Sequence, residues 1–210
     1  MYEKQKKDIV DTGRALYDRG MLVGTDGNMS IRVSEDEMLI TASGVCKGKL
    51  TEDLICLTDM KGNIKEGPKP ARDIKMHLAV YESRPKSLAV VHAHPPAATG
   101  WAMTELAPDR MILPEITFNL GEIAVTDFAL PTTDEVPAAV RSALTGKPSC
   151  GAIILANHGA TTWGQDIEAA FYRMETLEMY VKALAVSKIL GTQRYLTEEE
   201  EEKVNRLIHT

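Results

Sequence analysis

Cysteine is scarce in this chain of 210 residues, and basic stretches and long apolar runs are missing. The three cysteines, Cys46, Cys56 and Cys150, are spread out and form no C-x-x-C pair. Their odd number argues against a disulfide framework and favours a reduced, cytoplasmic setting. No apolar run approaches the ~20 residues of a membrane span. The first ten residues, MYEKQKKDIV, also lack the apolar stretch of a secretory signal.

The charge balance limits the classes of function further. The chain has 24 basic and 30 acidic residues, a net charge of −6 and a pI of about 5.4, which argues against a nucleic-acid-binding surface. A small anionic substrate is still compatible, because a few local donors can hold a phosphate whatever the net charge. The hydrophobic fraction of 44% can form a core, and the length favours one domain over residues 1–210.

Predicted helices and strands alternate along the whole chain. Helical spacing and breakers predict helices over 2–19, 73–83, 97–103, 133–145, 166–190 and 197–210. Strands are expected over 29–34, 38–41, 54–59, 87–94, 151–159 and 160–164, with further short strands between 111 and 131. This alternation favours one α/β domain whose central sheet is covered by helices. The tight turns between several strands favour antiparallel pairing.

Two histidines, His92 and His94, close the apolar run 87-SLAVVHAH-94. Side chains alternate faces along a strand, so these two point the same way, roughly 7 Å apart. The pair alone fits two hydrogen-bonded core histidines as well as two metal ligands. His158 also closes an apolar strand, in 153-IILANHG-159. If the two strands are neighbours, three imidazoles meet at one sheet edge, and three nitrogens with an open fourth position are typical of catalytic zinc.

A metal centre that performs chemistry needs a proton carrier, and Asp73 is the candidate. It follows a proline-rich loop and opens the helix predicted over 73–83, where its alternative role is a plain N-cap. Arg72 is either a surface residue or a contact for a phosphate or carboxylate. His77 lies on the apolar face of the same helix and is expected to be a core residue or to support the site. The penultimate His209 is assigned no role.

Two loops, 24-GTDGNMS-30 and 41-TASG-44, combine glycine with short polar side chains. Glycine lets the backbone approach a ligand closely, and Asn, Ser and Thr add hydrogen-bonding groups. Together the loops could form an anion nest, although a loop of this kind taken alone is more often an ordinary turn. Neither matches a P-loop or a dinucleotide-binding fingerprint.

The motifs occur in a definite order: G-x-x-G-N-x-S, T-x-S-G, a carboxylate before a helix, H-x-H-P, and N-H-G before a long helix. From about residue 8 to residue 190, this order resembles the class II sugar-phosphate aldolase and epimerase family. That family includes L-fuculose-1-phosphate aldolase and L-ribulose-5-phosphate 4-epimerase. The resemblance implies a three-layer α/β/α fold and a homotetramer with active sites between subunits.

The resemblance also implies roles for individual residues. A divalent metal, usually Zn²⁺ with Mn²⁺ or Co²⁺ as alternatives, would be held by His92, His94 and His158. The positions that match the family's substrate phosphate site are Asn28, Ser43 and Gly44. Asp73 matches the acid/base position, and Arg72 adds a guanidinium beside the phosphate site. The partner implied is a small sugar phosphate, with no nucleic acid or membrane.

The chain departs from the family pattern at three places. Asp73 stands where the aldolases usually carry Glu and the epimerase carries Asp. Ala71 and Arg72 replace a Ser-Ser pair, so that two hydroxyl donors are exchanged for one guanidinium. Phe118 lies near the position of a catalytic tyrosine, and Tyr195 is a candidate for a hydroxyl from the C-terminal region.

The expected reaction is retro-aldol cleavage of a ketose 1-phosphate, such as L-fuculose 1-phosphate, to dihydroxyacetone phosphate and an aldehyde. The metal would act as a Lewis acid for the enediolate, and Asp73 would shuttle the proton. A sugar-phosphate 4-epimerase is an alternative that Asp73 favours. Further alternatives are a related metal-dependent decarboxylase or dehydratase, and a non-catalytic metal-binding homologue.

Overall fold

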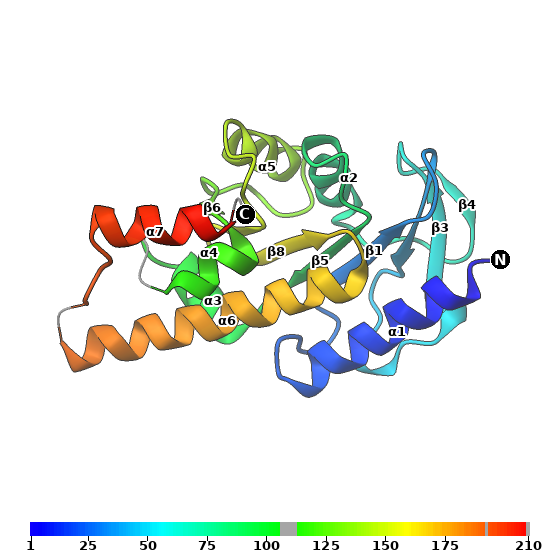
Figure 1. The fold of residues 1–210 in the computed structure, drawn as a ribbon. Helices are drawn as coiled ribbons and strands as arrows, with labels where there is room; N and C mark the ends of the chain where they lie inside the picture. The colour runs from blue at the N-terminus through cyan, green and yellow to red at the C-terminus, as the bar shows by residue number, and fades with distance from the viewer. Residues whose placement is uncertain (106–112, 192, 209–210) are drawn as a thin grey trace.

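An eight-stranded sheet is the centre of the fold in the computed structural model, which describes residues 1–105, 113–191 and 193–208 (Figure 1). The strand order is β4-β3-β2-β1-β5-β8-β7-β6. Every neighbouring pair is antiparallel except β6 and β7, so the predicted largely antiparallel sheet is confirmed. The strands are β1 (Asn28–Arg32), β2 (Glu37–Thr41), β3 (Ile55–Asp59), β4 (Ile64–Glu66), β5 (Ala89–Ala93), β6 (Ile123–Val125), β7 (Ala152–Leu155) and β8 (Gly159–Gly164).

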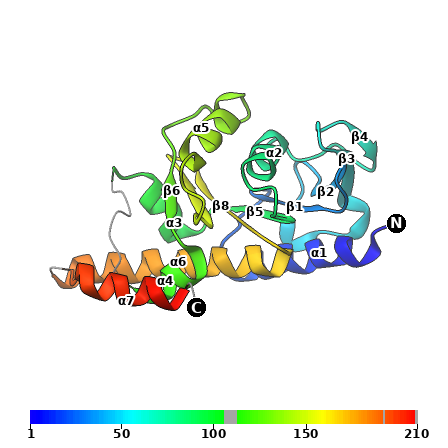
Figure 2. The ribbon, with the colours of Figure 1, turned by 45° about the horizontal axis from the view of Figure 1, so that its top comes forward.

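Helices cover both faces of the sheet and make the three predicted layers, as Figure 2 shows. On one face a buried apolar cluster joins the sheet to α1 (Glu3–Asp18), α3 (Pro96–Ala102), α4 (Pro114–Leu120) and α6 (Ile167–Leu190). On the other face a second cluster joins it to α2 (Ile74–Ser83) and α5 (Glu135–Leu144). Because β5 lies between the two layers, all five of its side chains are buried. This double burial explains why its sequence is a continuous apolar run.

The segment between residues 113 and 131 confirms one of the predicted short strands, as β6, and departs from the prediction before it. Residues Pro114–Leu120 form the helix α4, while residues 111–112 lie outside the described part. Pro114 is tolerated because it occupies the first helical position, where no N–H is needed. Ile116 and Leu120, four residues apart, bury one face, and Gly121 ends the helix at a φ of +61°. The strand β4 was not predicted either, since all three of its residues are exposed.

The C-terminal segment forms the helix α7 (Glu198–Ile208), as expected, and packs against α4. Within one chain, none of the acidic residues 198–202 of α7 lines the cavity that His94 and His158 border. His209, to which the sequence assigns no role, lies outside the described residues. None of the described helices is long and apolar enough to cross a bilayer.

Candidate metal centre and active site

The three predicted histidines meet at one end of the sheet. His92 is the fourth residue of β5 and is buried, and His94 follows directly after that strand. β7 is not the neighbour of β5, because β8 lies between them. His158 instead joins the cluster from the short turn between β7 and β8, so β7 ends earlier than the predicted strand over 151–159. The ring centroids of the three imidazoles are 4.9–5.1 Å apart.

The donor atoms of this cluster suit a metal ion. One nitrogen from each ring lies within 4.8 Å of the others. His92 Nδ1 lies 3.0 Å from the carbonyl oxygen of Ala160, which can only accept, so Nδ1 donates and Nε2 carries a lone pair. Nε2 of His92 lies 3.2 Å from Nε2 of His94. This separation is close to the roughly 3.3 Å that Zn–N bonds of about 2.05 Å and tetrahedral angles give.

Burial favours the neutral form of two of the three histidines, His92 and His158. It lowers the pKa of His92 well below 6.5, and the neighbouring His158 and His94 lower it further. Burial also lowers the pKa of His158, as does His94, while Asp73 and Asp26 oppose the change. Metal binding requires deprotonated imidazole, so no proton has to leave these two rings at neutral pH.

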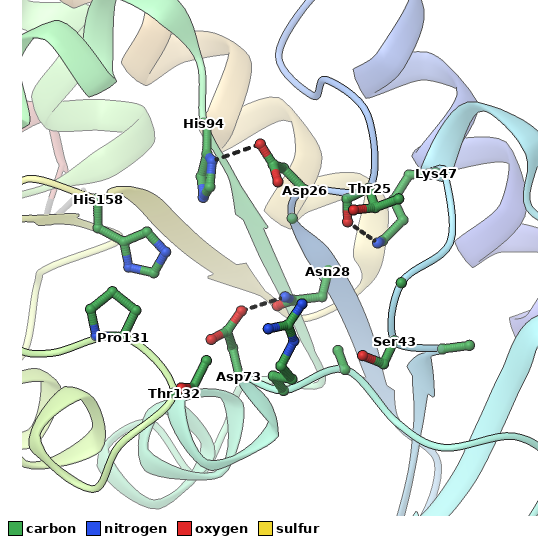
Figure 3. A pocket seen from close by; sticks show the side chains of 15 residues that line it. Thr25, Asp26, Asn28, Ser43, Lys47, Asp73, His94, Pro131, Thr132 and His158 are labelled. Carbon is green, nitrogen blue, oxygen red and sulfur yellow. Dashed lines mark hydrogen bonds and ion pairs between the residues drawn. The ribbon is translucent and has the colours of Figure 1, made fainter.

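Asp73 precedes α2 and directs its carboxylate to Asn28 instead of to the N–H groups of the helix. Asn28 Nδ2 donates to Asp73 Oδ2 over 2.8 Å, and Figure 3 shows this bond beside the histidines. The plain N-cap role that the sequence left open is therefore not the one adopted. Asn28 begins β1 and pairs with His92 in the sheet, so strand register brings Asp73 to the histidine cluster.

A cavity of about 250 Å³ unites the predicted residues. Its lining includes Asp73, Asn28, Ser43, Gly44, Arg72, His94 and His158, whereas His92 lies behind them. The loop after β2 supplies Ser43 and Gly44, and the segment before α2 supplies Arg72. Residues separated by more than 100 positions thus converge because β2, β1, β5 and β8 are consecutive in the sheet.

Two charged residues of the cavity were not predicted. Asp26 Oδ2 lies 3.6 Å from His94 Nδ1, which makes it a carboxylate partner for a candidate ligand. Lys47 is buried, and its Nζ donates to the carbonyl oxygens of Thr25 and Val45 over 2.8 Å each. Burial lowers the pKa of Lys47 to about 8, although Asp26, Cys46 and Asp73 oppose this. The signals in the sequence were an acidic residue inside the first glycine loop and a lysine three residues after the second.

Pro131 and Thr132 also line the cavity, from the segment before α5. Thr132 has a φ of +67°, a backbone conformation that β-branched residues rarely adopt. Sequence spacing gave no signal for this contribution, because the segment is brought in by tertiary packing. Phe118 is half-exposed on α4, and within the described residues neither it nor Tyr195 lines the cavity.

Comparison with known proteins identifies the family. Residues 7–185 match the model of the Class II Aldolase and Adducin N-terminal domain. The chain is 34% identical over 204 residues to a 3-oxo-tetronate 4-phosphate decarboxylase of Haemophilus influenzae, covering 93% of each chain. It is 32% identical over 188 residues to a methylthioribulose-1-phosphate dehydratase of Pseudomonas savastanoi pv. phaseolicola, covering 84% of this chain and 91% of that protein.

A solved structure of an L-fuculose 1-phosphate aldolase superposes with a TM-score of 0.89 and 28% identity, covering 100% of this chain and 98% of that one. This likeness confirms the predicted fold class. The relatives catalyse more than one reaction, so membership alone does not name the substrate. The chain belongs to the class II aldolase family, and its resemblance to that family is confirmed.

Proposed function

We propose that this chain is a divalent-metal-dependent carbon–carbon lyase that cleaves a ketose 1-phosphate to dihydroxyacetone phosphate and an aldehyde. The observation that carries the proposal is that the cluster of three imidazoles borders a cavity also lined by Asp73 and Arg72. The full-length likeness to an L-fuculose 1-phosphate aldolase supports it.

His92, His94 and His158 would hold the metal, with Zn²⁺ as the first candidate and Mn²⁺ or Co²⁺ as alternatives. When bound, the metal supplies Lewis-acid polarisation of the substrate's carbonyl and hydroxyl oxygens. The protein's own part is to fix the three nitrogens. The Ala160 carbonyl orients the His92 ring, and Asp26 stands beside Nδ1 of His94.

Asp73 is the proposed acid/base residue. When the C–C bond breaks, the carbon that keeps the bonding electron pair must gain a proton. Asp73 lies on the wall of the same cavity as His94 and His158 and can exchange that proton with the carbon. Asn28 holds the carboxylate in place through its 2.8 Å hydrogen bond.

Ser43, Gly44 and Arg72, which line the same cavity, form the proposed phosphate site. Ser43 and Gly44 contribute a hydroxyl and backbone groups, and Arg72 contributes a charged fork suited to phosphate oxygens. Asn28 has one amide N–H left for the phosphate, since Asp73 occupies the other. Arg72 here takes the place of the hydroxyl pair that the family pattern would supply.

Decarboxylation of a 3-oxo acid phosphate is the second candidate. The decarboxylase relative favours it, with 34% identity over nearly the full length of both chains. The residues proposed for the lyase reaction would also support decarboxylation, because loss of CO₂ likewise leaves an electron pair on a carbon that Asp73 can protonate. Epimerisation at C4, which the shorter side chain of Asp73 favours, would reform the bond without releasing products.

The test is product identification with zinc-loaded protein. We expect L-fuculose 1-phosphate or a related ketose 1-phosphate to yield dihydroxyacetone phosphate in a coupled assay. CO₂ from a 3-oxo acid phosphate would favour the second candidate, and an isomerised sugar phosphate without cleavage would favour the epimerase.

The variants follow from the site. His92→Ala should lose both metal and activity. Asp73→Asn should keep the metal and lose roughly 100-fold or more in kcat, the usual contribution of a positioned acid/base group. Asp134→Asn makes the same change at the start of α5 and should leave both unchanged. Normal turnover by metal-free protein would contradict the proposal.

A further inference from the structure

A buried row of five polar side chains runs from Asp73 away from the cavity. In order they are Asp73, Asn28, His77, Ser30 and Tyr81, and the four hydrogen bonds that join them measure 2.8, 2.6, 2.7 and 2.8 Å. His77 and Ser30 are fully buried, and Asn28 and Tyr81 are 4% and 2% exposed. Water therefore has little access to any link beyond Asp73.

The row exists because a helix and a strand have matching repeats. Asp73 directly precedes α2, and His77 and Tyr81 follow it on that helix at intervals of four residues, which is a rise of roughly 6 Å each. Asn28 and Ser30 are two residues apart on β1, which spaces them by roughly 6.6 Å on the same face. Side chains from the two elements therefore alternate along one line.

The direction of each hydrogen bond follows from the carboxylate at one end. A carboxylate oxygen accepts, so the Asn28 atom that faces Asp73 is Nδ2 and the atom that faces His77 is Oδ1. His77 must then donate from Nε2. Burial lowers the pKa of His77 to about 4, so the neutral ring accepts at Nδ1 from the Ser30 hydroxyl. Tyr81 donates in turn to Ser30, and all four bonds point toward Asp73.

We propose that His77, Ser30 and Tyr81 are positioning residues that hold Asn28, and through it the Asp73 carboxylate, in the cavity. The inference rests on the acid/base role of Asp73 in the proposed function. Asp73 has a competing position, because a carboxylate before a helix is stabilised by accepting from the helix N–H groups. The row fixes the Asn28 amide so that its donor faces Asp73, and successive bonds in such a chain strengthen one another.

The first experiment needs no substrate. Neutron diffraction of the deuterium-exchanged protein should find deuterium on Nε2 of His77 and none on Nδ1. In a crystal structure of His77→Leu, the Asp73 carboxylate should leave Asn28 and accept from the first N–H groups of α2. Deuterium on Nδ1 of His77, or an unmoved Asp73 in the variant, would overturn the proposal even if no substrate is ever cleaved.

The second experiment separates positioning from general stability. In the zinc-loaded enzyme, His77→Leu should lower kcat by roughly 100-fold, the size of effect expected from a misplaced catalytic group, with KM and zinc content unchanged. His77→Gln keeps a donor toward Asn28 and should recover most of the loss. Tyr81→Phe removes only the last hydroxyl and should cost a few-fold in kcat.

A matched control is Tyr180→Phe, which removes a buried tyrosine hydroxyl on α6, away from the row. It should leave kcat unchanged. Tyr81→Phe and His77→Gln preserve side-chain volume, so they keep the test decisive if His77→Leu fails to fold. A kcat of Tyr81→Phe equal to that of the parent enzyme, or a kcat of His77→Gln no higher than that of His77→Leu, would overturn the proposal.

Discussion

Burial makes the stability of the folded state depend on pH at several histidines, and His77 is the one that lies outside the candidate metal ligands. Its pKa is lowered from 6.5 to about 4, chiefly because the ring is buried, while Asp73 opposes the change. In the unfolded chain His77 binds a proton below about pH 6.5, whereas in the folded chain it binds one only below about pH 4. The free energy of unfolding therefore does not depend on the titration of His77 above pH 6.5. It falls by on the order of 3 kcal/mol as the pH falls from 6.5 toward 4.

Urea unfolding of metal-free protein between pH 7 and pH 4.5 measures this dependence. The free energy of unfolding should fall more steeply for the parent protein than for His77→Gln, which has no group titrating in that range at this position. Carboxylates and the other histidines are common to both proteins and cancel in the comparison. If the two proteins show the same dependence of the free energy of unfolding on pH, then His77 has the same pKa in the folded and the unfolded chain.

Single residues were predictable where their chemistry is rare and their spacing regular. His92 and His94 follow from the period of a strand, and Asp73 from its place before a helix. The direction of the Asp73 carboxylate was not predictable, since it depends on the bond from Asn28 across 45 positions. Lys47 was overlooked because a lysine in a loop is ordinarily solvated, and only the packed structure buries it.

At the scale of elements, Glu178 of α6 fixes the start of α3. Its carboxylate, 2% exposed, accepts from the backbone N–H groups of Ala97 and Ala98 over 2.9–3.1 Å. α3 begins two residues after His94, so this contact also fixes the backbone next to that candidate ligand. Glu178→Ala should lower the free energy of unfolding by about 1.5–3 kcal/mol, as for hydrogen bonds to a buried charge, and should weaken zinc binding.

Calorimetry and zinc titration of Glu178→Ala measure the two effects. Glu175→Ala is the matched control on the same helix, because its partner Arg19 is exposed and such surface pairs contribute at most about 1 kcal/mol. If Glu175→Ala and Glu178→Ala lose equal stability, the buried contact has no special role. Unchanged zinc affinity in Glu178→Ala would show that the contact at the start of α3 does not contribute to zinc binding.

Elements were predictable from the sequence where one physical signal dominated. β5 was recognisable because burial on both faces gives an unbroken apolar run, and α1 because its buried residues repeat at helical spacing. Short segments with mixed signals were misread. α4 carries β-branched residues but is helical, because Pro114 starts it and its apolar pair packs on the layer beside α6. For such segments tertiary packing outweighs local propensity.

At the scale of the whole molecule, α6 carries an exposed apolar stripe that one chain leaves uncovered. Tyr172, Met179, Val186 and Leu190 follow one another at intervals of seven, seven and four residues, so they share a helix face. Their exposed fractions run from 48% to 82%. Exposed apolar side chains that share one helix face favour an interface, and the resemblance to the aldolase family implies a homotetramer with active sites between subunits.

We therefore expect light scattering to give a particle of about four times 23.1 kDa. Met179→Glu combined with Val186→Glu should reduce this mass, because charges cannot be buried in an apolar contact without a large penalty. Leu88→Glu changes an isolated exposed apolar residue and should leave the assembly intact. If neighbouring subunits complete the cavity, the dissociated double variant should keep its zinc, which one chain can hold, and lose turnover. Full activity in a dissociated species would mean that each chain carries a complete site.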